Sequence, residues 1–192
     1  MKSLSLSKPH VIVMVGIPGS GKSFFAEHFA GTFNAPIINY ARLHKELFGS
    51  STNNSENEAI INKVANYLFD EVLKTGRTIV YDGQTDLRTE RAIIAKKSRD
   101  AGYEPLLVWV QTESVTAKKR AIKTHLSAEQ FDHAMKRFSA PHQSEKAIVI
   151  SGKHTYNSQL KIILKHLVEP RAQIIERQHL VRPSVGRNAL IR

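Results

Sequence analysis

The 192-residue sequence contains no cysteine and no long hydrophobic run. The first absence excludes disulfide bonds and any zinc site built on cysteine ligands. The second argues against a membrane-spanning helix, which needs about 20 consecutive apolar residues. The first eight residues also lack an apolar core of the length typical of a secretory signal. From these absences we expect a soluble, cytoplasmic protein.

A glycine-rich loop stands between a run of strand-forming residues and a segment with helical periodicity. Residues 11–15 read Val-Ile-Val-Met-Val, which predicts a buried strand, and residues 16–23 then match the P-loop pattern G-x-x-x-x-G-K-[ST]. The backbone N–H groups of such a loop fold around a phosphate, and glycines are needed where a Cβ would clash. The predicted phosphate-binding residues are Gly16, Ile17, Pro18, Gly19, Ser20, Gly21, Lys22 and Ser23.

The last two residues of this loop would carry its chemistry. In P-loop proteins the lysine, here Lys22, reaches the β- and γ-phosphates, and the hydroxyl of Ser23 binds Mg²⁺. The helix that follows adds the positive end of its dipole to the same pocket. The pattern therefore predicts ATP and Mg²⁺ as ligands. The alternative is a glycine turn without a ligand, and the strand-loop-helix context argues against it.

Acidic residues are scarce relative to basic ones. The chain has 28 Lys and Arg against 17 Asp and Glu, so its formal net charge is +11. This excess favours a polyanionic partner such as nucleic acid. The alternative is a generic charge that aids solubility, because a nucleotide site by itself also attracts Lys and Arg.

Apolar runs alternate with helical segments along the whole chain, which predicts a single α/β domain. Further strands are expected at 35–39, 78–82, 105–110 and 147–150, and helices at 21–32, 40–48, 86–101, 113–124, 127–138 and 157–168. A long helix should run from a capping box at Ser55 and Glu58 to Lys74. Its packed face is expected to carry Ile60, Val64, Leu68 and Val72. The packed face of the first helix is expected to carry Phe24, Phe25, His28 and Phe29, and Trp109 is assigned to the core.

The strand at 78–82 ends in an acid, Asp82. After an apolar strand in a P-loop protein, such a carboxylate is expected to bind Mg²⁺ or organise the attacking group. Asp82 is therefore a candidate catalytic and metal-binding residue, together with Lys22 and Ser23. The alternative is that Asp82 only caps the turn Asp82-Gly83-Gln84.

A basic helical segment lies at about residues 115–142. Within it, residues 118–137 carry six Lys or Arg against two acids, which is typical of a mobile lid whose cations meet the transferring phosphate. We expect Arg120 to be the catalytic cation, although a solvated charged helix face would show the same pattern. The turn after the last strand supplies Gly152 and Lys153, which would pack against the adenine ring.

These segments together resemble P-loop kinases of the group that holds phage-type polynucleotide kinase, zeta toxins and small bacterial AAA-type ATP-binding proteins. The resemblance covers roughly residues 10–168. It rests first on the P-loop and on the Ile-Asn strand before a helix that ends Leu47-Phe48-Gly49. It also rests on two strands with the basic residues that follow them, Val80-Tyr81-Asp82 with Arg91 and Val108-Trp109-Val110 with Lys119-Arg120. It implies a three-layer sandwich with a five-stranded parallel sheet in the order 2-3-1-4-5, helices on both faces, and ATP as the phosphate donor. Residues 169–192 would then be a basic tail beyond the kinase-like domain of residues 1–168.

The sequence departs from this group after its second strand. Such kinases have an Arg-Asp-Asp-like stretch there, in which one Asp takes the proton from the acceptor hydroxyl. Here the corresponding residues are Tyr40, Ala41 and Arg42, and an alanine cannot be a general base. Asp82 or Asp86 would have to take that role. In the lid, the second arginine expected four residues after Arg120 is replaced by Thr124.

Two functions therefore remain open. The first is transfer of the ATP γ-phosphate to a hydroxyl acceptor, either a polynucleotide end, which the charge favours, or a small compound. The second is a pseudokinase or slow ATPase that uses ATP as a conformational switch, which the missing Asp favours. A protein that only binds RNA is disfavoured, because no platform of alternating aromatic and basic residues is visible. The choice between ATP and GTP is left open.

Overall fold

The computed structural model describes residues 8–49, 54–124 and 126–168. The expected strands and helices are present, with ends that differ by a residue or two. The strands are β1 (His10–Val15), β2 (Ile37–Asn39), β3 (Ile79–Asp82), β4 (Glu104–Gln111) and β5 (Ile148–Ser151). The helices are α1 (Lys22–Phe33), α2 (Tyr40–Phe48), α3 (Ser55–Leu73), α4 (Arg88–Asp100), α5 (Ser114–Lys123), α6 (Ala128–Arg137) and α7 (Tyr156–Val168), and η1 (Gln143–Glu145) is a short 3-10 turn. The expected tail at 169–192 lies outside the described residues.

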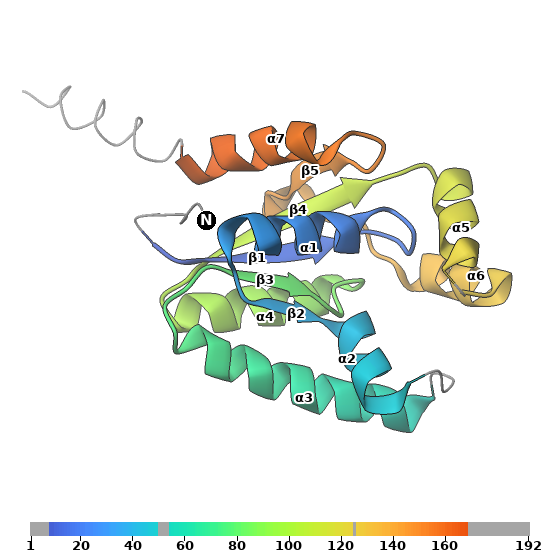
Figure 1. Cartoon of the computed structure of the whole chain (residues 1–192), viewed down its shortest axis with the longest axis horizontal. Helices are drawn as coiled ribbons and strands as arrows, with labels where there is room; N and C mark the ends of the chain where they lie inside the picture. The colour runs from blue at the N-terminus through green and yellow to red at the C-terminus, as the bar shows by residue number, and fades with distance from the viewer. Residues whose placement is uncertain (1–7, 50–53, 125, 169–192) are drawn as a thin grey trace, which may run out of the picture.

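The five strands form one parallel sheet in the order β2-β3-β1-β4-β5, as the resemblance implied. β1 lies at the centre, and all six of its residues are buried. Figure 1 shows α1 and α7 on one face of the sheet and α3 and α4 on the other, with α5 and α6 beyond the carboxyl ends of the strands. This three-layer arrangement brings the loops after the parallel strands to one edge, where ligands of open α/β sheets bind.

Side chains alternate between the two faces of β1 and so belong to two separate cores. Ile12 and Met14 pack with Phe25 and Phe29 of α1, whereas the odd-numbered residues of the strand face α3 and α4. The continuous apolar run that predicted a buried strand therefore reflects helices on both faces of a parallel sheet. Among the described residues, no helix is long and apolar enough to cross a membrane.

The register of α3 differs from the prediction by one residue. The buried positions are Ile61, Ala65, Phe69 and Leu73. The predicted row lies beside them and is only partly covered, since its first residue, Ile60, is 40% exposed. Two apolar rows run side by side along this helix, and both repeat every four residues, so periodicity alone does not separate them. The row that contains Phe69 faces the sheet, where its ring lies 5.2 Å from the ring of Tyr81.

The start of α3 is also one residue earlier than the capping box predicted. Asn54 is the N-cap, and its Oδ1 accepts a hydrogen bond of 2.7 Å from the N–H of Asn57. Asparagine caps helices as well as serine does, so residue type alone does not show which of the adjacent Asn54 and Ser55 is the cap. In α1 the prediction was half right. Phe25 and Phe29 are buried, whereas Phe24 and His28 are exposed.

Arg91 of α4 is a buried charge that joins distant segments of the chain. Its side chain is 1% exposed and makes a bidentate ion pair with Glu145, at 2.7 and 3.0 Å. Its third nitrogen, Nη1, donates to the carbonyl oxygens of Thr85, Asp86 and Ser139. The guanidinium is therefore neutralised and hydrogen-bonded throughout, as a buried arginine must be. It fastens the segment after α6 to the loop between β3 and α4.

Glu145→Gln is expected to lower the free energy of unfolding by about 3 kcal/mol, because it leaves the buried Arg91 without its counter-charge. The hydrogen bond from Arg91 also holds the pKa of Glu145 below its usual value. This stabilisation should therefore be present at neutral pH and be lost as the pH falls through the lowered folded-state pKa. Denaturant unfolding at neutral and acidic pH measures both effects. The matched control is Glu71→Gln on the surface of α3, which should leave the unfolding midpoint nearly unchanged.

Candidate active site

The glycine-rich loop connects the end of β1 to the start of α1, as the sequence pattern predicted (Figure 1). The N–H of Ser20 donates to the carbonyl oxygen of Ile17 at 3.1 Å, which closes the turn. Gly19 has a φ of 75°, and a Cβ added there would lie 2.1 Å from the carbonyl oxygen of Ala117 in α5. Glycine is required at this position for both reasons. The first helix of the expected lid therefore packs directly on the loop.

Asp82 lies beside Lys22 and Ser23. It is the last residue of β3 and is 5% exposed. Burial raises the pKa of its carboxyl group, while the charge of Lys22 and a hydrogen bond from the Ser23 hydroxyl oppose part of that rise. The three predicted residues thus meet at the carboxyl edge of the sheet. An ammonium group, a hydroxyl and a carboxylate together can contact phosphate and a hard cation.

The oxygens of Ser23 and Asp82 fit a magnesium ion. The described residues contain no group of three or more His, Cys, Asp or Glu side chains that could hold a metal. A magnesium ion bound with nucleotide phosphates does not need such a group, because one or two protein oxygens usually suffice. The predicted pair would therefore complete a coordination sphere supplied mainly by phosphates and water.

The structure adds Asn39, which the sequence analysis did not select. It ends β2 and stands opposite Asp82 in the strand register. Its Nδ2 donates to Oδ2 of Asp82 at 2.9 Å, and its Oδ1 accepts from the N–H of Arg42 at 2.8 Å, which caps α2. Because both ends of the amide are engaged, the amide cannot turn, and it fixes one carboxylate oxygen of Asp82. The only signal in the sequence was its place at the carboxyl end of a strand.

Asp86 lies on the loop between β3 and α4 and also faces Lys22. Burial raises the pKa of its carboxyl group, and the charge of Lys22 opposes that rise. The backbone carbonyl of Asp86 accepts a hydrogen bond of 2.8 Å from the N–H of Ser139, which follows α6. Nearby, Arg137 of α6 forms an ion pair with Glu90. The loop that carries Asp86 and the first turn of α4 are therefore attached to the end of α6 and the residues that follow it.

α5 and α6 form a small unit with its own apolar contacts, and we refer to residues 115–142 as the lid segment. Ala117 and Ala121 of α5 pack with Phe131 of α6 and with Ile17 of the P-loop. Lys118 bridges the two helices through an ion pair of 2.7 Å with Asp132. α6 begins with a capping box formed by Ser127 and Gln130. Not every cation of this segment is therefore available to a ligand.

A cavity of about 370 Å³ lies beside the P-loop, at the turn between β5 and α7. Its walls are formed by Gly21, Phe24, Arg120, Gly152, Lys153, His154 and Gln159. Nη1 of Arg120 donates to the carbonyl oxygen of Gly152 at 3.0 Å. A Cβ on Gly152 would lie 1.9 Å from the carbonyl oxygen of Ser20, so this turn also packs on the P-loop. Arg120, Gly152 and Lys153 are thus brought next to the loop.

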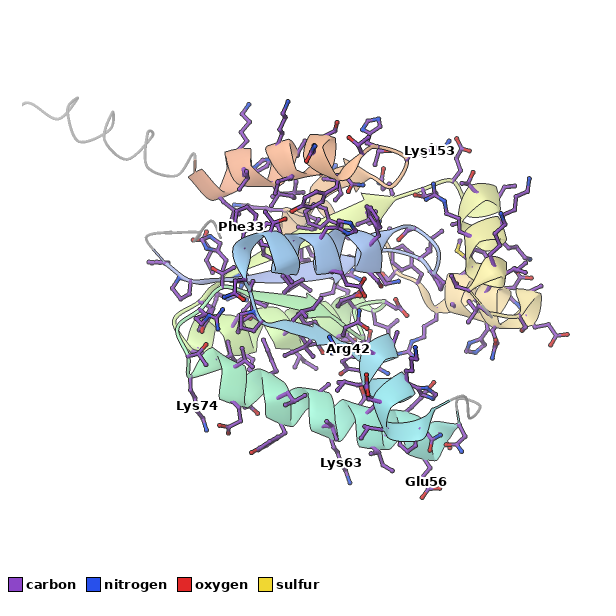
Figure 2. All side chains as sticks on the ribbon, viewed as in Figure 1. Phe33, Arg42, Glu56, Lys63, Lys74 and Lys153 are labelled. Carbon is purple, nitrogen blue, oxygen red and sulfur yellow. The ribbon has the colours of Figure 1, made fainter. Side chains whose placement is uncertain are left out.

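Figure 2 shows Lys153 on the turn between β5 and α7, near the start of α5. Its ammonium group forms an ion pair of 2.8 Å with Glu113. Trp109, which the sequence analysis assigned to the core, is partly buried and packs at the margin of the core that faces α3 and α4. It also lines a second cavity, of about 570 Å³, with Phe138 and Val149. Val149 of the edge strand β5 is 46% exposed, so part of the sheet face next to Trp109 is uncovered.

Comparisons with known proteins agree with this architecture. The structure is similar to that of a gluconokinase from Sinorhizobium meliloti, with a TM-score of 0.64 and 14% identity over 89% of this chain and 98% of that one. Kti12 from Chaetomium thermophilum, solved with ADP-AlF3, gives a TM-score of 0.62 and 15% identity, and the match covers 81% of this chain and 96% of that one. A chain of the Pnkp1/Rnl/Hen1 complex gives a TM-score of 0.51 and 22% identity, and the match covers 62% of this chain but only 42% of that one.

A search of curated proteins finds no match to the chain. At these identities, the three comparisons show a shared fold and nothing more specific. The family model described as "AAA domain" matches residues 11–141, which include the P-loop, Asp82 and the lid segment. The chain therefore belongs to the AAA domain family, with the fold of P-loop kinases.

Proposed function

We propose that this protein binds ATP with Mg²⁺ and transfers the γ-phosphate to a hydroxyl acceptor, with a polynucleotide favoured. The observation that carries the proposal is the buried Asp82 carboxylate beside Lys22 and Ser23, held in place by Asn39. A carboxylate that only capped a turn would not need a hydrogen-bonded partner on the neighbouring strand. The similarity to kinases of several kinds supports phosphotransfer in general.

Each residue has a role in this proposal. Lys22 and the loop N–H groups bind the phosphates, and the oxygens of Ser23 and Asp82 would hold Mg²⁺, which neutralises charge on the phosphates when bound. Arg120 stands beside the loop and would turn from Gly152 to the transferring phosphoryl group. The turn at Gly152 and Lys153 would hold the nucleobase. Positioning and electrostatics would thus supply most of the rate.

The acceptor hydroxyl needs a base. Its oxygen would form the new bond to the γ-phosphorus while the bond to the bridging oxygen of ADP breaks, and its proton must leave. We favour Asp86 for this proton, because Asn39 and Ser23 already engage the carboxylate of Asp82. Burial raises the pKa of Asp86, which makes its carboxylate a better proton acceptor than a fully solvated one.

A polynucleotide acceptor is favoured by exposed cations on both sides of the P-loop. Arg42 is exposed at the start of α2, where Figure 2 shows it, and Lys123 and Lys136 are exposed on the lid segment. Arg42 follows the strand where related kinases carry an acid, so it would attract a phosphate backbone. Lys118 and Arg137 contribute less, because acids of the chain pair with them.

Neutralising Lys123 and Lys136 together is expected to reduce the salt dependence of single-stranded RNA binding. Each phosphate contact contributes a slope of about −0.7 in a plot of log affinity against log salt, so the double variant should lose about one to two units. Fluorescence anisotropy between low and physiological salt measures the slope. The control is the double change of Lys63 and Lys161, two exposed lysines on α3 and α7. Equal slopes for both double variants would make the charge generic and favour a small acceptor.

The second candidate function is an ATP-driven switch or slow ATPase without transfer. The observation that favours it is the absence of a carboxylate at Tyr40, Ala41 and Arg42, where the related kinases carry the acid that takes the acceptor proton. A screen with γ-labelled ATP against RNA 5′ ends, nucleosides and small polyols separates the two candidates. Label that moves to an acceptor, and does not move with Lys22→Ala, supports transfer. Label released only as inorganic phosphate, or retained on ATP, supports the switch.

A further inference from the structure

Phe24 of α1 is a large apolar side chain that stays exposed beside the P-loop. It is the second residue after Lys22 and is 52% exposed, although the helical periodicity predicted it on the packed face. A single exposed apolar residue is common on protein surfaces and by itself needs no explanation. Phe24, however, lines the 370 Å³ cavity beside the P-loop together with Gly21, the residue before Lys22. The rest of a molecule whose phosphates occupy the loop can therefore reach this side chain.

The ring of Phe24 is held in place by His28, which lies one turn later on α1. The centroids of the two rings are 4.0 Å apart, with 38° between the ring planes. Nδ1 of His28 donates a hydrogen bond of 2.8 Å to the carbonyl oxygen of Phe24, which fixes the imidazole in turn. The ring of Tyr156 on α7 lies 5.4 Å from that of His28 and extends the cluster. A side chain that is ordered before its ligand arrives loses little conformational entropy on binding. The ring is thus a preformed stacking surface.

The turn after β5 forms another wall of the cavity, and its backbone is already hydrogen-bonded within the protein. The N–H of Gly152 donates to the carbonyl oxygen of Gln111 at 2.8 Å, and the N–H of His154 donates to that of Ser151 at 3.2 Å. The N–H of Lys153 donates to Oγ of Ser151 at 3.3 Å. The carbonyl oxygen of Gly152 accepts from the lid segment. These four backbone groups are therefore not available to read the edge of a nucleobase.

Adenine and guanine differ at their edges and not at their faces. Position 6 carries an amino donor in adenine and a carbonyl acceptor in guanine, whereas both bases present the same N7 acceptor. A protein distinguishes them with hydrogen-bonding groups in fixed directions, and stacking on an aromatic ring accepts either base. The charged side chains of Arg120 and Lys153 also line the cavity. They are donors only, and N7 offers them an acceptor on either purine.

We propose that Phe24 is the platform on which the nucleobase stacks, and that the site therefore binds ATP and GTP about equally well. The inference rests on the proposed nucleotide site. It deepens that proposal, because the P-loop binds phosphates and does not distinguish one base from another. The base contributes to the affinity through its face, and the groups on its edge contribute little.

The first test compares nucleotides on the unchanged protein. Calorimetry with Mg²⁺ measures the binding of ATP and of GTP, and the two dissociation constants should lie within about threefold of each other. A larger gap in either direction would overturn the inference, because it would require a group that reads the edge of the base. Since the parent protein is used, this arm stays decisive even if a variant fails to fold.

The second test removes the ring. Phe24→Ala should weaken the binding of ATP and of GTP by the same factor, about tenfold, which is a typical loss for one base–aromatic stack. The binding of inorganic tripolyphosphate, which has no base, should not change. Phe24 belongs to neither apolar core, so the variant should fold, and Phe24→Tyr, which keeps the ring, should bind all three ligands as the parent does. Unchanged ATP binding, or an equal loss for tripolyphosphate, would overturn the inference.

The matched control is Tyr67→Ala on α3. It also removes an aromatic ring from the surface of a helix, and Tyr67 is 64% exposed and does not line the cavity. The affinities for ATP, GTP and tripolyphosphate should equal those of the parent. If this variant lost as much affinity for ATP as Phe24→Ala does, the loss would not report stacking, and the inference would be wrong.

The inference and the proposed function fail in different ways. If neither nucleotide nor tripolyphosphate binds, or if Lys22→Ala leaves each affinity unchanged, the proposed nucleotide site is wrong and the inference falls with it. If the ligands bind through Lys22 but Phe24→Ala changes nothing, only the role of Phe24 is wrong. A loss on Phe24→Ala that is equal for ATP and GTP and absent for tripolyphosphate supports both proposals.

Discussion

Lys22→Ala is expected to weaken ATP·Mg²⁺ binding about 100-fold, which corresponds to the loss of charge-assisted hydrogen bonds to two phosphates. Lys22 is the only cation in the P-loop motif, and its charge acts on the carboxyl groups of both Asp82 and Asp86. Without it, the buried carboxyl group of Asp82 and the partly buried one of Asp86 would face the phosphates directly. Calorimetry with ATP, with and without Mg²⁺, measures the loss.

The control for this prediction is Lys161→Ala on the exposed surface of α7, which removes the same charge from a residue that belongs neither to the P-loop nor to the cavity beside it. Its affinity for ATP should equal that of the parent. Thermal melting of the Lys22 variant should still show a cooperative transition, because Lys22 belongs to neither apolar core. If both variants bind ATP equally well, the loop is a glycine turn and the nucleotide site is not there.

Much of the fold could be predicted because its signals are local. The run of apolar residues in β1 and the glycines after it lie within one stretch of sequence, and their spacing reflects one loop geometry. The strand order then followed from the resemblance. The errors in α3 have a local cause as well, because Asn54 and Ser55 are both good caps and two apolar rows run along the helix. Which row is buried is decided by packing against the sheet, where Phe69 contacts Tyr81.

The parts of the site that were not predicted are those made by contacts between distant segments. Asn39 becomes informative only when the strand register places it opposite Asp82, 43 residues away in sequence. Asn39 belongs to no short motif, and its chemistry depends on a partner that the local sequence does not contain.

Asp82→Asn is expected to reduce phosphate release or transfer at least about 100-fold, because the amide cannot hold Mg²⁺ as a carboxylate does. It should also abolish the strengthening of ATP binding by Mg²⁺, which can be measured even if turnover is slow. The amide oxygen can still accept the hydrogen bond from Asn39, so the strand pairing should survive. The matched control is Asp100→Asn at the exposed end of α4, which should change neither quantity.

The stability of the same variant separates a functional carboxylate from a structural one. Burial raises the folded-state pKa of Asp82 above the ordinary value of 3.8, so the charged form costs the folded protein stability. That cost is absent below the ordinary pKa and grows as the pH rises through the raised one. Asp82→Asn should therefore melt at the parental temperature or higher at neutral pH, and the difference should shrink as the pH falls toward 4. A turn cap would instead lose about 1 kcal/mol of stability on this change and keep its turnover. A lower melting temperature with normal turnover would thus remove Asp82 from the active site and assign it to the turn.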